Sequence, residues 1–219
     1  MVIGKGRVLA VFCLALPGLA AADGNTLFLV QDSTGGTGAR NTLSIDQSGG
    51  TNTRIAGSVD GLAPARQTGS GNAADINVAG TDVTVLFSQG GATDTAFNNT
   101  ATINADGQSL FASLEQLGSD NTGVINLDGT NSSGTILQDG VGNTGALTVG
   151  GTNASGTLVQ RGNDNDLGLV VSGADTNVSF TLVGNGLGPG PLAATEGGSV
   201  AVFSNAGAVN ITTTVLGGP

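Results

Sequence analysis

The chain has 219 residues, 39 of them glycine, and it contains no histidine, tryptophan or tyrosine. Sixteen acidic residues oppose six basic ones, a formal net charge of −10 at pH 7, which excludes nucleic acid and anionic membranes as partners because both take clustered Lys and Arg. With no histidine and a single cysteine, the usual zinc sites and His-dependent nucleophilic triads are also excluded.

Residues 1–22 have the pattern of a secretory signal peptide. Lys5 and Arg7 form a charged start, residues 8–16 an apolar stretch, and Ala20–Ala22 a small-residue cleavage site. The apolar stretch is too short to cross a bilayer as a helix. Cleavage would remove the only cysteine, Cys13, and leave four arginines against sixteen acidic residues, a net charge of −12. We therefore expect an exported chain without disulfides.

Two strand-like segments follow. Residues 25–31 and 41–47 both alternate polar and apolar side chains and both end in glutamine, with a Gly- and Thr-rich run between them. We assign residues 23–40 to an N-terminal segment and residues 41–186 to a repeat domain.

A 22-residue period dominates the repeat domain. Copies begin at Asn99, Asn121 and Asn143, and each carries a glutamine at the same place. Around the glutamines the spacing is Gln-x-Gly-x-x-Asn, with Asp in one copy, and the steps from one glutamine to the next are 20, 22, 27, 22 and 22. The step of 27 contains an insertion at residues 94–98. A fixed period of this length indicates a repeat architecture. The recurring residues are Gln47, Gly49, Asn52, Gln67, Gly69, Asn72, Gln89, Gly91, Asp94, Gln116, Gly118, Asn121, Gln138, Gly140, Asn143, Gln160, Gly162 and Asn165.

Each repeat contains two alternating runs bounded by Gly, Asn and Asp, and therefore predicts two strands. One face of each first strand is apolar in every copy, as is the face of each second strand that ends on glutamine. Examples are Ile76, Ile103, Ile125, Leu147 and Leu169 in the first strands, and Val85, Ala112, Leu114 and Ile136 in the second. Because a one-residue slip would turn a strand over, this agreement specifies the register.

Two strands in each repeat, with turns too short for helical crossovers, predict an all-β fold. The expected architecture is a β-solenoid of stacked strand–turn–strand repeats with two parallel sheets. Inward Asn and Gln need partners, because an unpaired buried amide costs roughly 1–3 kcal/mol. Stacked on the same residue one turn away, each amide can donate to one neighbour and accept from the other, which predicts ladders along the axis. Glycine supplies the positive φ of the turns.

The repeat resembles the curlin repeat of bacterial curli fibres, whose centre reads Q-x-G-x-x-N-x-A-x-V. Residues 67–76 match it closely, and residues 138–147 match with Gly for Ala and Leu for Val. The resemblance covers roughly residues 47–177, but the family's second amide is here Val78, Leu127, Val149 or Val171. It implies a secreted, cell-surface amyloid fibre subunit of biofilm matrix and adhesion, which polymerises with itself. It also implies export through an outer-membrane pore and a nucleating curlin-like subunit as partner.

The C-terminal part departs from the repeat. Residues 177–184 keep a strand but lack the glutamine, and Gly184 is expected in its place. Residues 187–219 contain Pro189 and Pro191 in a Gly-rich loop, followed by two expected closing strands at 199–203 and 210–215. The pattern leaves open whether this tail caps the repeats or joins a fibre.

Other functions have less support. The carboxylates are scattered singly, so we expect no enzyme, and no motif indicates a cofactor. Residues 163–166 resemble the opening of a calcium loop but lack its spaced glycine and closing Glu, so no metal site is expected. The alternative to a fibre subunit is a monomeric, capped β-solenoid adhesin or ligand-binding surface protein. Outward residues such as Thr122, Val124 and Asn126 are too mixed for a regular ice- or glycan-binding array.

Overall fold

The computed structural model describes residues 24–32, 40–47, 51–90, 96–172, 176–188, 192–195 and 199–204. The expected signal peptide and the strand expected at 210–215 lie outside these residues. Over the described part the protein is all-β, with fifteen strands and no helix. Accordingly, no helix of this part could span a membrane.

Every strand pairing in the structure is parallel, as the repeat pattern predicts. The largest sheet has ten strands: β1 (Thr26–Leu27), β2 (Leu29–Asp32), β4 (Arg54–Ala56), β5 (Ala65–Thr68), β7 (Thr84–Gln89), β8 (Phe111–Ser119), β9 (Ser133–Val141), β11 (Ser155–Arg161), β13 (Asn177–Val183) and β15 (Ser199–Ser204). A second sheet contains β10 (Thr144–Val149), β12 (Asp166–Ser172) and β14 (Leu192–Thr195), and a third contains β3 (Thr42–Ser44) and β6 (Ala73–Asp75).

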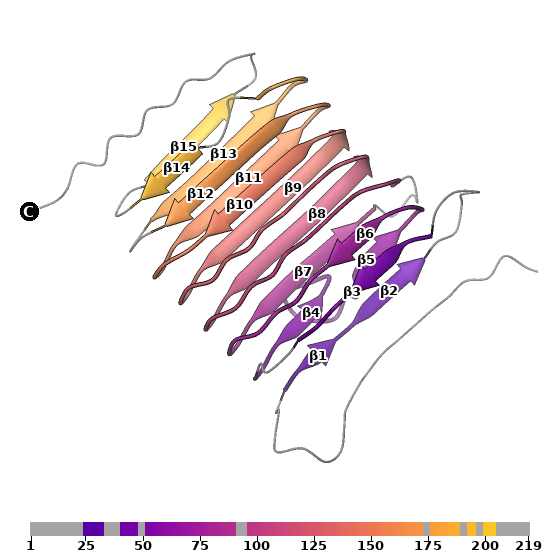
Figure 1. Ribbon diagram of the computed structural model, residues 1–219, viewed down its shortest axis with the longest axis vertical. Helices are drawn as coiled ribbons and strands as arrows, with labels where there is room; N and C mark the ends of the chain where they lie inside the picture. Colours follow the sequence, from indigo (N-terminus) through magenta and orange to yellow (C-terminus); the bar gives the residue numbers. More distant parts are fainter. Residues whose placement is uncertain are drawn as a thin grey trace, which may run out of the picture.

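The chain passes alternately through the ten-stranded sheet and the smaller sheets. Isolated parallel bridges join Ala73 to Thr100, Thr100 to Thr122 and Thr122 to Thr144, so the segments at Thr100 and Thr122 connect β6 to β10. We call one pass through the ten-stranded sheet together with the smaller-sheet segment that follows it a row. Figure 1 shows the strands side by side in chain order, from β1 in indigo to β15 in yellow.

Neighbouring rows are in register at the repeat period wherever the sequence period is uninterrupted. Gln116 lies beside Gln138, and Gln138 beside Gln160. Two insertions change the offset. Gln89 pairs with Gln116 across the longest of the predicted steps. Ile55 pairs with Val85 whereas Gln67 pairs with Gln89, so the segment between β4 and β5, residues 57–64, forms an additional loop. This loop contains Pro64, which has no backbone N–H to donate and therefore suits an interruption of the strand.

Apolar side chains from the two sets of sheets form one core. The alternation of burial along β9 and β11 places every second residue inside, as the two-residue period of a strand requires. The faces predicted to be apolar are the buried ones, and the largest fully buried side chains are Phe87, Phe180, Ile55, Ile76, Ile103, Leu110, Leu114, Ile125, Leu127, Ile136, Leu147 and Leu158. The sequence-based faces are therefore confirmed.

Candidate functional site

A row of glutamines runs through the interior. From Gln67 to Gln160 the five glutamines are fully buried, and each of the first four donates from Nε2 to Oε1 of the glutamine in the next row. The donor–acceptor distances are 2.9, 2.8, 2.9 and 2.9 Å. Each Nε2 also donates to backbone, as Gln138 does to the carbonyl oxygens of Thr122 at 2.8 Å and Asn143 at 3.1 Å. The ladder thus satisfies amides that are costly to bury unpaired.

A second ladder, of asparagines, runs beside it in the opposite sense. Asn143 donates from both its backbone N–H and its Nδ2 to Oδ1 of Asn121, at 3.0 and 3.1 Å, and Asn165 does the same to Asn143. The glutamine ladder donates toward the C-terminal rows and the asparagine ladder toward the N-terminal rows. The side-chain amide dipoles of the two ladders therefore oppose one another, which limits the net dipole along the stack.

The predicted glycines lie where each row turns between the sheets. Gly69, Gly118, Gly140 and Gly162 have φ of 101°, 95°, 140° and 110°, a region that favours glycine. A Cβ added to Gly140 would lie 1.9 Å from the carbonyl oxygen of Gly162. That same carbonyl accepts a hydrogen bond from Asn143 Nδ2 at 2.8 Å. Glycine is thus required both by the backbone conformation and by the approach of the next row.

Small residues face the glutamine ladder from the smaller sheets. A Cβ added to Gly145 would lie 3.1 Å from Gln138 Nε2 and 3.1 Å from Gln160 Oε1. Gly123 stands in the same relation to Gln116 and Gln138. Glycine at this position of a row therefore leaves room for two neighbouring amides.

Both ladders end at the same row. Leu182 pairs with Gln160 where the next glutamine would lie, and Leu187 donates its backbone N–H to Asn165 Oδ1 at 3.0 Å. Both leucines are buried. The small residue facing the glutamines also changes, because Leu167 follows Gly145 in register. The structure corrects the expectation for Gly184, since it aligns with the turn glycine Gly162 and Leu182 replaces the glutamine.

The structure also corrects the first repeat. Gln67 accepts from Gln31 at 2.7 Å, not from Gln47, and Asn72 pairs with Asn41, not with Asn52. Asn52 is exposed and donates to Asp82 Oδ1 at 2.9 Å. The physical reason is that residues 25–31 and 41–47 are the two halves of one row. Both end in glutamine, so a pattern of alternation cannot distinguish them.

The insertion after Gln89 also changes which residue occupies the asparagine ladder in that row. Asn99, not Asp94, occupies the asparagine ladder between Asn72 and Asn121, with hydrogen bonds of 3.0 Å to Asn72 Oδ1 and 2.9 Å from the Asn121 N–H. Asp94, Gly49 and Gly91 lie outside the described residues. The 22-residue period that begins at Asn99 predicts this position correctly, because Asn99 and Asn121 are one period apart.

Further side-chain amide hydrogen bonds, which span fewer rows than the two ladders, lie along the outer edges of the stack. Asn98 donates to Asp120 at 3.2 Å, Asn131 to Asn153 at 3.0 Å, and Asn126 to Asn104 at 2.7 Å. Most of these residues have positive φ, which explains why Asn and Asp rather than branched residues occupy the turns. These contacts account for many asparagines that sequence reasoning treated only as turn formers.

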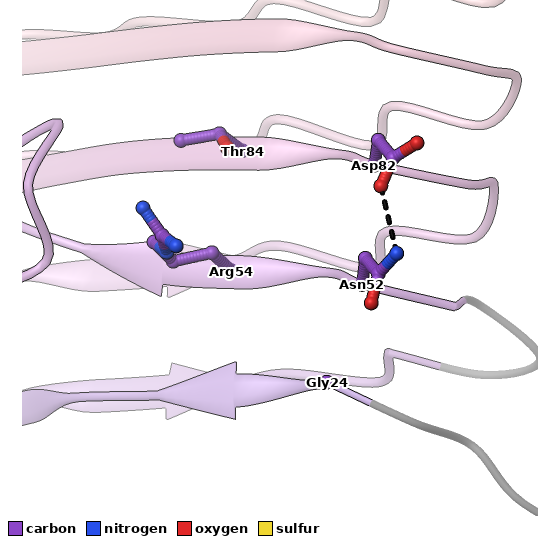
Figure 2. A pocket seen from close by; sticks show the side chains of 5 residues that line it. All are labelled: Gly24, Asn52, Arg54, Asp82 and Thr84. Atoms are coloured by element: carbon purple, nitrogen blue, oxygen red, sulfur yellow. Dashed lines mark hydrogen bonds between the residues drawn. The ribbon is translucent and has the colours of Figure 1, made fainter.

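A surface hollow lies beside the second row (Figure 2) and is lined by Gly24, Asn52, Arg54, Asp82 and Thr84. Three of the polar side chains that line it are hydrogen-bonded to one another or to the adjacent loop. Asn52 bonds Asp82, and Arg54 Nη1 donates to the carbonyl oxygen of Val59 at 3.0 Å.

The loop at residues 57–64 is held by its own polar contacts. Asp60 Oδ1 accepts hydrogen bonds from the Ser58 hydroxyl and from the Leu62 N–H, the latter at 3.0 Å. The Ser58 hydroxyl bond, followed by the Leu62 bond, lowers the pKa of the Asp60 carboxyl, to which Arg54 also contributes. Val59 and Leu62 extend outward from this loop, at 65% and 81% exposure.

Comparisons with known proteins return no match: no protein-family model, no curated protein and no solved structure is significantly similar to this chain.

Among the described residues, no group of three or more His, Cys, Asp or Glu is placed to hold a metal ion. The buried glutamines and asparagines form the two ladders. What the arrangement offers chemically is a periodic hydrogen-bonding template.

Proposed function

We propose that this protein is an extracellular structural protein, a subunit of a curli-like fibre that self-assembles by stacking the ends of a β-solenoid. The observation that carries the proposal is the glutamine ladder, in which one buried amide contact repeats from row to row. A stack of parallel rows has no intrinsic length limit, since an added row makes the same backbone bonds as an existing one even where the ladders end.

In this proposal each row is one solenoid turn, equal to one sequence repeat. Support comes from the wholly parallel pairing and from the repeat-for-repeat register of β8, β9, β11 and β13. The backbone bonds are of the same kind at each step, as from the Thr122 N–H to the Asn143 carbonyl and from the Thr144 N–H to the Asn165 carbonyl, at 2.8 and 2.7 Å.

The ends of the stack supply the route to a fibre. The outermost strands of a parallel sheet have one side of N–H and C=O groups without a strand beside it, and such edges pair with further strands. A head-to-tail contact between identical copies is heterologous and does not close, so it generates a filament. The acidic surface, with a net charge of −12 after the expected cleavage, opposes uncontrolled association.

The same proposal places the protein outside the cell. The signal-like residues 1–22 and the curlin resemblance together support secretion, passage through an outer-membrane pore and assembly on a nucleating curlin-like subunit. Roles in biofilm matrix and adhesion follow from the resemblance. Catalysis forms no part of the proposal.

The test follows assembly of residues 23–219 after dilution from denaturant. We expect a lag in thioflavin fluorescence, growth that preformed product seeds, and fibre diffraction with the spacings of about 4.7–4.8 Å and ~10 Å. A β-rich species that remains monomeric for days would reject the fibre and favour the capped adhesin.

A further inference from the structure

The N-terminal edge, formed by β1, β2 and β3, is one end of both ladders. In the described part of the chain β1 pairs only with β4, β2 only with β5 and β3 only with β6. One side of each strand therefore faces away from the stack, as Figure 1 shows for the indigo end. The amide-bearing residues of this edge include Gln31, Asn41 and Gln47.

Gln31 ends the glutamine ladder with an acceptor. Its Nε2 donates to Gln67 Oε1 at 2.7 Å, in the same sense as every later step. In the later rows Oε1 accepts from the preceding glutamine, for example Gln138 Oε1 from Gln116 Nε2 at 2.9 Å. No described residue precedes Gln31 in the ladder, so its Oε1 faces the place of a glutamine Nε2.

Asn41 ends the asparagine ladder with a donor. Its Oδ1 accepts from the Asn72 N–H at 3.0 Å, and its Nδ2 donates to the Gly69 carbonyl at 3.1 Å. In later rows the asparagine N–H donates to Oδ1 of the preceding asparagine, as Asn143 does to Asn121. The Asn41 N–H has no such asparagine before it in the described chain and faces the place of an Oδ1.

Gln47 adds a third group. Its Nε2 is buried and has no hydrogen-bond partner. Ser44 pairs with Asp75, and the same register carried on toward the end of the segment brings Gln47 to the position of Val78. Leaving such a donor buried and unpaired costs roughly 1–3 kcal/mol, a penalty that an acceptor on a docked row removes.

No row of this chain in the described residues matches all three groups. The rows with a complete Gln and Asn carry an apolar residue at the Gln47 position: Val78, Ala105, Leu127, Val149 and Val171. In the described part of the C-terminal edge the three positions carry Ser204, in register with Leu182, then Leu187, and Ala194, in register with Val171. A second copy that stacks through these C-terminal strands therefore presents no side-chain amide at any of the three positions.

We propose that the N-terminal edge is the docking site for a different repeat chain, one whose terminal row carries amides at the positions of Gln31, Asn41 and Gln47. Glutamine Nε2 of that row donates to Gln31 Oε1, its asparagine Oδ1 accepts the Asn41 N–H, and its third amide oxygen accepts from Gln47 Nε2. Self-stacking through the described C-terminal strands retains the backbone pairing but supplies no side-chain amide at these three positions, so the amide-bearing row binds more tightly. The inference rests on the proposed function for its stacking geometry and adds the partner of one end.

The experiment measures peptide binding to the full chain, immobilised sparsely enough that copies do not meet. The probe is the synthetic row 132–153 with Val149→Gln, which presents Gln138, Asn143 and a third amide. The matched control is the unmodified row, which differs only at residue 149. A third peptide, with Gln138→Leu and Asn143→Leu, imitates the row of Leu182 and Leu187, where both ladders end.

We expect the Val149→Gln peptide to bind about tenfold more tightly than the unmodified row, the effect of pairing one otherwise unsatisfied buried amide. The leucine peptide should bind more weakly than both. Gln47→Val in the immobilised chain should abolish or reverse the preference, and it removes an amide with no partner, so the fold should persist.

Equal affinity of the first two peptides, or a preference that survives Gln47→Val, would overturn the inference. So would displacement of the Val149→Gln peptide by the soluble full chain at equal concentration, which would make a second copy the better occupant. Fibre growth without this peptide preference leaves the proposed function standing and removes the inference. If the peptide preference is observed but no fibres grow, the inference stands and the proposed function is rejected.

Discussion

Gln138 Nε2 lies 2.9 Å from Gln160 Oε1, and both side chains are completely buried. The contact joins positions one sequence repeat apart in β9 and β11, so it links the sequence period directly to the packing of the core. A buried amide of this kind gives specificity as well as stability, because a strand slipped by one residue would carry the glutamine to the outer face.

Replacing Gln138 by alanine should lower the free energy of unfolding by roughly 1–3 kcal/mol for the amide left unpaired, and further for the cavity. Urea unfolding before assembly begins measures the loss. Assembly should slow in parallel, and replacing Asn143 in the same chain should slow it further. Thr135→Ser with Thr144→Ser, both on outward positions, is the matched control, with a change within about 0.5 kcal/mol. Equal losses in the two double variants would contradict the ladder argument.

Gly140→Ala tests the turn. The φ of 140° alone costs an L-residue roughly 1–3 kcal/mol, and the new Cβ would meet the Gly162 carbonyl oxygen at 1.9 Å. Gly150→Ala is the control, since no atom lies within 4 Å of a Cβ added there. We expect the midpoint of urea unfolding to fall strongly for Gly140→Ala and to change little for Gly150→Ala. Similar midpoints would show that the turn relaxes around a side chain.

Much of this fold could be predicted from the sequence because the same constraint is repeated. From Asn99 to Asn165 each inward residue is specified several times over, and the faces, the register and the turn glycines are all as the period predicts. The errors fall where a row is unique. Gln31 and Gln47 lie in similar segments, and only the pairing of Gln31 with Gln67 and of Ser44 with Asp75 distinguishes the ladder from the adjacent column.

Other features depend on contacts that no spacing records. The opposed sense of the two ladders follows from the orientation of each amide, as in the Gln138–Gln160 and Asn143–Asn121 bonds. The loop at 57–64 interrupts a strand whose two parts, β4 and β5, both pair with β7. Pro64 indicates an interruption. The contacts of Asp60 and Arg54 that order the loop occur only once in the chain, so no repeat in the sequence predicts them.

The loop should respond to acid through Asp60. Its pKa in the folded chain lies below the ordinary 3.8, so the ionised form stabilises the loop above that pH and the stabilisation is lost as the pH falls through the lowered value. Hydrogen exchange at the Leu62 amide, corrected for the intrinsic rate, should therefore accelerate as the pH falls below the ordinary 3.8. Asp60→Asn should exchange faster at neutral pH and lose this pH dependence. An unchanged profile in that variant would exclude Asp60 as the cause.

The end of the glutamine ladder gives a test based on coupling. Leu182 occupies the glutamine position and Leu167 the position of the small residue that faces it, so the two leucines replace an amide and a glycine together. Gly145 leaves space for Gln138 and Gln160, whereas Leu167 fills the equivalent space in the next row. Leu182→Gln alone should therefore destabilise the chain. Leu167→Gly alone should also destabilise it by opening a cavity. With both changes, Gln160 Nε2 gains an Oε1 acceptor and the new amide gains its space. We therefore expect the double variant to be more stable than the sum of the single losses predicts, by roughly 0.5–3 kcal/mol in a urea-unfolding cycle. Additive losses would show that Leu182 and Leu167 do not act as a pair, and that the ladder stops there for a reason outside the core.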